Sequence, residues 1–180
     1  MKYSSGAAAD AVDLSAWSVA ARVRAGIRYV PERSDVFPGM SVEENVELAS
    51  LAVGRPWTKS MLEQEIGALF PALIERRHAP AETLCGGQRR MLSLSMALVQ
   101  EPRLLLIDEP FAGLAPMVVD DLTASLRLIS RRGIGVAVID HNITAILALA
   151  DRIVLLKLGE VVFDRPREAV QESMILEAFA

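Results

Sequence analysis

The strongest constraint on the fold comes from two short apolar segments that each end in acidic residues. Residues 104–110 read LLLIDEP, and residues 134–141 read IGVAVIDH. Such segments are too short to cross a bilayer, and their near-continuous apolar character is typical of strands buried in a parallel sheet. Segments with helical spacing lie between the strands. This alternation predicts an α/β fold built on a parallel sheet.

Periodicity and helix start and stop signals assign the remaining elements. The predicted strands are 27–30, 103–108, 134–140, 152–156 and 160–163. The predicted helices are 14–23, 42–53, 61–70, 88–100, 116–132 and 143–150. Ser41 and Glu44 form a capping box at the start of the second helix, and Ser60 with Glu63 predicts the start of the third. Pro71 is expected to end or kink that third helix.

The elements divide the chain into three regions. Residues 1–40 form part of the core, residues 41–95 form a helical block inserted between strands, and residues 96–180 complete the core. A chain of 180 residues, 52% of them hydrophobic, fits a single domain with a real core. Residues 1–10 lack the apolar centre of a secretion signal, so no targeting peptide is expected.

Charge and cysteine content exclude some classes of protein. A net charge of -4 and a pI of about 5.3 argue against a nucleic-acid partner, which would require a basic surface. The single cysteine excludes an internal disulfide. Three local basic pairs are expected to be solvated helix faces: Arg76-Arg77, Arg89-Arg90 and Arg131-Arg132.

Gly86 and Gly87 open a predicted helix. Two glycines there leave main-chain N–H groups unpaired at the positive end of the helix dipole, an arrangement that suits a phosphate. Taken alone, such a pair is more often a simple turn. Leu84 and Gln88 beside the pair, with the acidic strand end downstream, favour the phosphate-binding interpretation.

Asp108 and Glu109 end a strongly apolar strand, where ligands of open α/β sheets bind. An aspartate there can hold magnesium through water, and the adjacent glutamate can orient or deprotonate an attacking water. Alone, an Asp-Glu-Pro strand end fits a solvated turn. His141 follows another strand, so a parallel sheet places it at the same edge as Glu109, within reach of a terminal phosphate. A lone histidine is more often structural, and this is the expected role of His78.

Several motifs together resemble the ATP-binding-cassette (ABC) ATPases, and specifically the group that serves branched-chain amino-acid importers. The resemblance covers the chain from about residue 26 onward. The segments that carry it are 29–32 (YVPE), 36–38 (VFP), 41–45 (SVEEN), 84–88 (LCGGQ), 104–110, 112–116, 139–142 (IDHN), 150–153 (ADRI) and 176–179 (LEAF).

The resemblance implies a role for each candidate site residue. Glu32 would face magnesium and the attacking water and would couple the site to a permease. Asp108 would hold Mg²⁺, Glu109 would be the catalytic base, and His141 would be the switch histidine. The signature loop, which contacts ATP held by a second subunit, would consist of Leu84, Cys85, Gly86, Gly87 and Gln88.

Three departures from the family pattern matter. The chain has no phosphate loop, Gly-x-x-x-x-Gly-Lys-Ser/Thr, because glycine precedes none of its lysines, Lys2, Lys59 and Lys157. Cys85 replaces the usual signature serine, which exchanges a good hydroxyl donor for a weak thiol. Ala115 stands where many relatives have aspartate. The expected fold is therefore a truncated P-loop ATPase core with an inserted helical subdomain.

The function implied is that of the ATP-binding subunit of an ABC importer, with ATP and Mg²⁺ as cofactors, for branched-chain amino acids or similar small polar solutes. Its implied partners are a second ATPase subunit and membrane permeases, and its implied location is the cytoplasmic face of the cell membrane. Alone the chain is expected to be inactive as an ATPase. The alternative is a non-hydrolysing or degenerate accessory module that pairs with a complete subunit.

Overall fold

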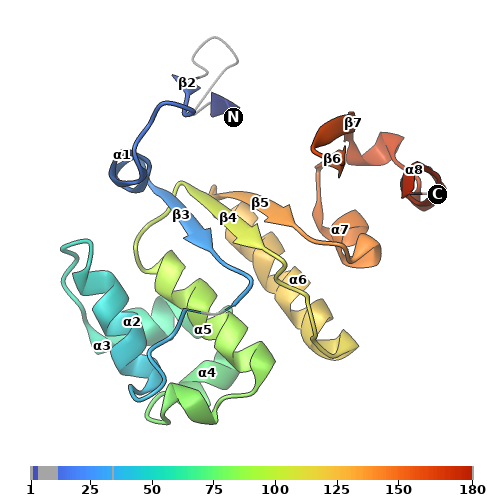
Figure 1. Cartoon of the computed structure of the whole chain (residues 1–180). Coiled ribbons are helices and arrows are strands. Elements are labelled where there is room, and N and C mark those ends of the chain that lie inside the picture. Colours follow the sequence, from blue (N-terminus) through green and yellow to red (C-terminus); the bar gives the residue numbers. More distant parts are fainter. Residues whose placement is uncertain (1, 4–11, 34, 180) are drawn as a thin grey trace.

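A three-stranded parallel sheet forms the centre of the fold (Figure 1). Its strands are β3 (Ile27–Val30), β4 (Leu104–Asp108) and β5 (Gly135–Ile139), paired in that order. The computed structural model describes residues 2–3, 12–33 and 35–179. The predicted α/β class and parallel pairing are confirmed.

The two apolar strands differ in their burial. In β4, Leu105 and Ile107 are fully buried, whereas the residues of β5 are half-buried or exposed, and Ile139 is 66% exposed. Complete burial of the second strand was therefore a wrong expectation. The reason is that β5 pairs only with β4 among the strands that the structure describes.

Two long helices pack on the sheet and contribute residues to the main core. Helix α5 (Gly86–Leu98) contacts β3, and α6 (Pro116–Arg131) contacts β5. Helix α6 is also in contact with α7 (Ile143–Leu149). The three completely buried residues of α6 recur at helical spacing and lie in the main core: Leu122, Leu126 and Ile129. The predicted helices at these positions are confirmed within two residues at each end.

The helical block forms the lower part of the molecule in Figure 1 and begins with α2 (Val42–Leu51), which packs on α5. The predicted capping box is present. The Ser41 hydroxyl accepts a hydrogen bond from the Glu44 N–H at 3.2 Å, and the Glu44 carboxylate accepts one from the Ser41 N–H at 2.7 Å. Two orphan donors at the helix start are thereby satisfied.

The predicted single helix over residues 61–70 is wrong. The segment forms a short α3 (Lys59–Met61), a π-helical turn η2 (Leu62–Ile66) and, after a break, α4 (Pro71–Glu75). Pro71 opens α4 instead of ending a helix, because its missing N–H costs nothing in the first turn. The start signal at Ser60 is also misplaced, since Thr58 is the N-cap.

The remaining elements surround these helices. Helix α1 (Val19–Arg24) is shorter than the predicted 14–23, and the strands β1 (Lys2–Tyr3) and β2 (Val12–Asp13) pair antiparallel. The 3₁₀ turn η3 (Ala81–Thr83) precedes α5. The segment 1–10, for which no targeting role was expected, lies mostly outside the described residues.

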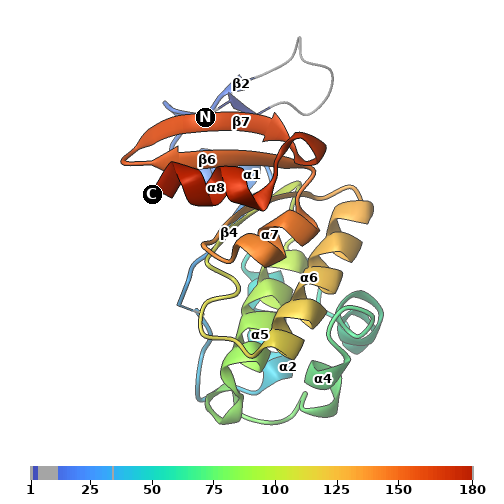
Figure 2. The same ribbon diagram turned by 90° about the vertical axis from the view of Figure 1, so that its right-hand side faces the viewer.

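A C-terminal unit of two strands and a helix lies at the end of the molecule opposite the helical block (Figure 2). Strands β6 (Arg152–Lys157) and β7 (Glu160–Pro166) form an antiparallel hairpin, followed by the 3₁₀ turn η4 (Arg167–Ala169) and by α8 (Glu172–Phe179). A second small core fills the space under the hairpin: Ile153, Leu155, Val170 and Ile175. Within the ranges described, no helix is long and apolar enough to span a membrane.

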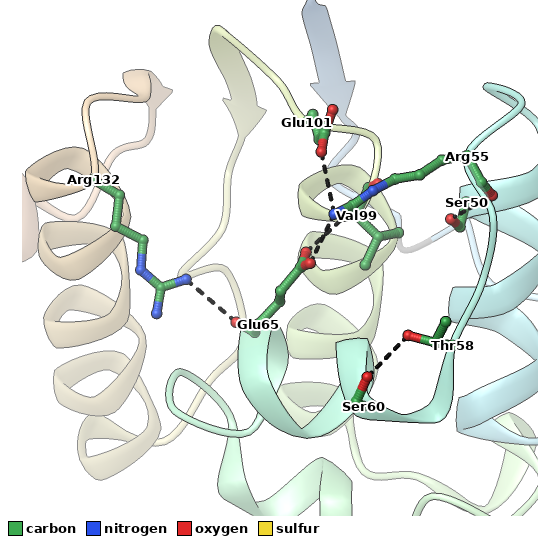
Figure 3. Close-up of polar contacts among 8 residues, drawn as sticks. All are labelled: Ser50, Arg55, Thr58, Ser60, Glu65, Val99, Glu101 and Arg132. Carbon is green, nitrogen blue, oxygen red and sulfur yellow. Dashed lines mark hydrogen bonds and ion pairs between the residues drawn. The ribbon is translucent and has the colours of Figure 1, made fainter.

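An arginine links the helical block to the far end of α5 (Figure 3). Arg55 donates to both carboxylate oxygens of Glu65, at 3.1 and 2.8 Å, and to the Val99 carbonyl at 3.0 Å. It also forms an ion pair with Glu101 at 3.1 Å, and Arg132 donates to the Glu65 carbonyl. A cavity of about 370 Å³ lies among these side chains. This cluster joins η2 to the ends of α5 and α6.

Candidate functional site

Polar side chains meet at the carboxyl edge of the parallel sheet. The Tyr29 hydroxyl, near the end of β3, donates to Oδ2 of Asp108, at the end of β4, with an O···O distance of 2.9 Å. This hydrogen bond stabilises the neutral phenol, and the nearby carboxylates add to the effect, so the pKa of Tyr29 is raised above its ordinary value. Tyr29 is 60% exposed, so this corner of the site is open to solvent.

Glu109 occupies an unusual main-chain conformation. Its φ is +42°, in the left-handed region that side chains other than glycine rarely adopt, and its N–H donates to the Ile139 carbonyl at 2.7 Å. The turn brings a carboxylate oxygen of Glu109 to 3.4 Å from Nδ1 of His141. Both side chains are accessible, with 39% and 74% of their surface exposed. The edge thus offers an acid and an imidazole side by side.

Asp140 is the buried support beneath this pair. Its carboxylate is fully buried and accepts two main-chain hydrogen bonds, from the N–H of Phe111 at 2.9 Å and from that of Asn142 at 2.8 Å. These bonds connect the turn after β4 to the loop after β5. The sequence included Asp140 only as part of a motif, and nothing in its spacing indicated this bracing role.

Arg90 is the most important residue of the site that sequence reasoning missed. The pair Arg89-Arg90 was expected on a solvated helix face, yet Arg90 is only 5% exposed. Its guanidinium donates to the carbonyls of Pro31 and Glu32 and, at 3.2 Å, to that of Glu109. Burial lowers the pKa of Arg90 below its ordinary value, and the carboxylates of the site oppose the shift.

The available signal for Arg90 was its position three residues after Gly87 on α5. Both residues are buried, whereas Arg89 between them is exposed. A helix places i and i+3 on one face, so a core-facing Gly87 puts Arg90 on the same face.

The glycine pair lies at the start of α5, which begins at Gly86, two residues earlier than predicted. Cys85 is the N-cap and is exposed, and Gln88 folds back so that its side-chain oxygen accepts from the Cys85 N–H at 3.2 Å. Leu84 is buried. A Cβ at Gly87 would stand 2.6 Å from a methyl carbon of Val118 in α6. A side chain at this position would therefore force Val118 to shift.

Glu32 follows β3 and is exposed. Its main-chain carbonyl accepts a hydrogen bond from the Arg90 guanidinium, which also donates to the Glu109 carbonyl, so Glu32 lies near the same edge. Across the described part of the chain, no group of three or more His, Cys, Asp or Glu side chains is arranged to hold a metal ion. Asp108 fits the usual Mg²⁺ mode, in which one or two carboxylates share the ion with water and substrate phosphates.

The candidate residues form two separate sets. Glu32, Asp108, Glu109 and His141 share the sheet edge, whereas residues 84–88 lie at the start of α5 against α6. Within the described residues, no hydrogen bond or ion pair joins residues 84–88 to the acids or the histidine of the edge. His78 is exposed and lies 3.5 Å from Glu43, away from both sets.

This combination of fold and edge chemistry agrees with the sequence comparisons. The profile of the ABC transporter family matches residues 2–112. A lipopolysaccharide export system ATP-binding protein, LptB, of Acidithiobacillus ferridurans is 33% identical over 170 residues, which are 93% of this chain and 70% of that protein. The chain therefore belongs to the ABC transporter family, among its ATP-binding proteins.

Two further relatives show the range within the family. A probable ABC transporter ATP-binding protein of Azorhizobium caulinodans is 36% identical and is matched by 91% of this chain. BraG, a high-affinity branched-chain amino acid transport ATP-binding protein of Pseudomonas aeruginosa, is 34% identical and is matched by 78% of this chain. The chain spans 58% and 60% of their lengths.

Solved structures confirm the fold. The ADP conformation of an ATP-binding cassette of an ABC transporter superposes with a TM-score of 0.72 at 22% identity, covering 87% of this chain and 68% of that one. A second solved structure, cbiO1 of Clostridium perfringens, part of the ABC transporter complex cbiONQ, superposes with a TM-score of 0.70 at 23% identity. It covers 88% of this chain and 64% of that one.

Proposed function

We propose that this chain acts as an ATP-binding subunit of an ABC transporter and contributes residues 84–88 to ATP held mainly by a second subunit. The observation that carries the proposal is the separation of the two candidate sets: the start of α5 is exposed, and among the described residues it makes no hydrogen bond or ion pair with the acids or the histidine of the chain's own edge. A surface that meets only part of a nucleotide requires a partner to supply the rest.

The residues of the sheet edge fit the other half of such a site. Asp108 would hold Mg²⁺ through water, Glu109 would orient the attacking water or accept its proton, and His141 would contact the terminal phosphate. ATP, when bound, supplies the phosphoryl group that is transferred to water. The Tyr29 hydroxyl would compete with magnesium for Asp108, because it already donates to that carboxylate.

For the solute we propose branched-chain amino acids or similar small polar molecules, carried by membrane permeases at whose cytoplasmic face this subunit binds. Support comes from the segments 29–32 and 41–45 and from the similarity to BraG. The similarity to LptB, a protein named for lipopolysaccharide export, leaves this choice to experiment. The net charge of -4 supports the absence of a nucleic-acid partner.

A non-hydrolysing accessory role is the second candidate, and it is favoured by Cys85, which puts a weak thiol donor where the signature usually has a serine hydroxyl. Both candidates predict that the chain alone does not hold ATP tightly. Titration with a fluorescent ATP analogue would contradict both if it showed saturable micromolar binding with magnesium-dependent turnover. The two candidates separate in a mixed pair with a complete subunit, where Glu109→Gln changes turnover only if the chain's own acidic edge takes part.

The proposed shared site is tested with Cys85, the chain's single thiol and an exposed one. The partner is a cysteine-free complete subunit of the branched-chain group that binds but does not hydrolyse ATP. We expect maleimide labelling of Cys85 to slow at least tenfold when this partner and ATP are both present. Ser173→Cys in a Cys85→Ala chain serves as a distant thiol control, because Ser173 is exposed in α8, at the end of the molecule opposite the helical block (Figure 2). An unchanged labelling rate in a pair shown to form and bind ATP would refute the shared site.

A further inference from the structure

The guanidinium of Arg90 joins three segments that are far apart in the sequence. It extends from α5, the helix whose start carries the glycine pair, to the carbonyls of Pro31 and Glu32 after β3 and to that of Glu109 after β4. All three acceptors are main-chain oxygens, so Arg90 fixes the path of the backbone and not the rotamer of a side chain.

The environment of Arg90 shows that these bonds are needed. The residue is 5% exposed, and a buried guanidinium without acceptors would be strongly unfavourable. Its planar fork can donate several hydrogen bonds in fixed directions, which the single ammonium of lysine cannot reproduce. The turn that it supports at Glu109 has a φ of +42°, a conformation that persists only where neighbouring structure holds it.

We propose that Arg90 is a positioning residue that holds the turn after β4 so that the Glu109 carboxylate faces His141, and that it thereby ties this acid to the helix carrying the signature segment. The relevance to ATP hydrolysis rests on the proposed function. The geometric claim does not, because it concerns contacts within this chain.

The test uses the imidazole NMR signals of the ¹⁵N-labelled chain at pH 8, where an ordinary histidine is neutral. The sequence has two histidines, and His78→Gln assigns the signals of His141. In the parent chain, Glu109→Gln should shift the His141 signals, since the two groups lie 3.4 Å apart, and should leave those of His78 unchanged. In an Arg90→Met background, Glu109→Gln should change the chemical shifts of the His141 signals at least threefold less than it does in the parent chain.

Arg55→Met is the matched control. Arg55 is also partly buried and donates to a main-chain carbonyl, that of Val99, but at the opposite end of α5 (Figure 3). Arg55→Met should leave the shift that Glu109→Gln causes in the His141 signals as large as in the parent chain. Arg90→Lys should give an intermediate effect, because lysine keeps the charge and loses the fork.

A full-sized effect in folded Arg90→Met, or no effect of Glu109→Gln in the parent chain, would overturn the proposal. If Arg90→Met fails to fold, Arg90→Lys is judged by whether its effect is smaller than that of the parent. Loss of folding in both variants while Arg55→Met folds would show a purely structural role and would also overturn it. Because the measurement uses neither ATP nor a partner, its failure is distinct from failure of the thiol-labelling experiment.

Discussion

Gly87 is expected to be intolerant of alanine because of packing, whatever its role toward phosphate. A Cβ at position 87 would lie 2.6 Å from Cγ1 of Val118, a distance that real Cβ atoms essentially never show. Val118 cannot easily move away, since a β-branched side chain in a helix has one strongly preferred rotamer. At Gly86 the nearest atom, Cδ2 of Leu114, is 4.0 Å away, which is ordinary contact.

The two glycines give a controlled comparison, because both lie in the first turn of α5 and neither has a positive φ. Replacing glycine by alanine at a compatible site stabilises by about 0.4–1 kcal/mol through the unfolded chain. Overpacking costs about 1–3 kcal/mol. Since the gain is common to both sites, Gly87→Ala should be less stable than Gly86→Ala by about 1–3 kcal/mol.

Urea unfolding measures this difference as a shift of about 1 M in midpoint, given a slope of roughly 1–3 kcal/mol per M. Val118→Ala removes the clashing methyl groups, so Gly87→Ala should cost little in that background. Equal midpoints for the two alanine variants, or no rescue by Val118→Ala, would refute the packing argument.

The outcome also decides which variant should be used to test phosphate contact. Gly86→Asp adds a charge without the clash, whereas Gly87→Asp combines both.

Three further predictions concern the Tyr29 hydrogen bond and the capping box of α2. The pKa of Tyr29 is raised mainly by its hydrogen bond to Asp108, so the stabilising effect of this bond should be present below the ordinary phenol pKa and lost as the pH rises through the pKa of the folded protein. Asp108→Ala should therefore lower the Tyr29 pKa, measured by ultraviolet titration of a chain in which the other tyrosine is replaced. An unchanged Tyr29 pKa would contradict the hydrogen bond. Ser41→Ala should cost about 1 kcal/mol in urea unfolding at pH 7. The hydrogen bond from the Ser41 N–H lowers the pKa of Glu44, so the stability that this carboxylate contributes should be lost as the pH falls below the ordinary glutamate pKa and through the lowered pKa of the folded protein. Glu44→Ala should therefore be less stable than the parent at pH 7, and the difference should be much smaller at pH 3.

The sequence predicted what depends on local pattern and strand order. The strand 27–30 has the predicted bounds, and the capping box at Ser41 forms as expected, because each is determined by residues close together in the chain. The sequence also predicted that Glu109 and His141 lie at one edge. Parallel strands bring their carboxyl ends together, and the observed separation is 3.4 Å.

Features that depend on contacts between distant segments were missed. The segment 61–70 has an apolar pattern that fits one helix, yet it forms the π-helical turn η2 and then breaks. Ser125 of α6 donates to the Leu69 carbonyl at 2.9 Å within this break, a contact that local spacing does not encode. The burial of Arg90 is similar, since its acceptors are 58, 59 and 19 residues away in the sequence.

These contacts give one face of α5 two tasks. Gly87 allows close approach to α6 at Val118, and Arg90, three residues later on the same face, holds the main chain beside Glu109. A shift or rotation of α5 relative to α6 would therefore change the position of the Arg90 guanidinium with respect to the turn after β4. Because main-chain carbonyls receive its hydrogen bonds, such a movement would act on the Glu109 turn directly. The packing of α5 on α6 and the geometry of the Glu109 turn are therefore linked through Arg90.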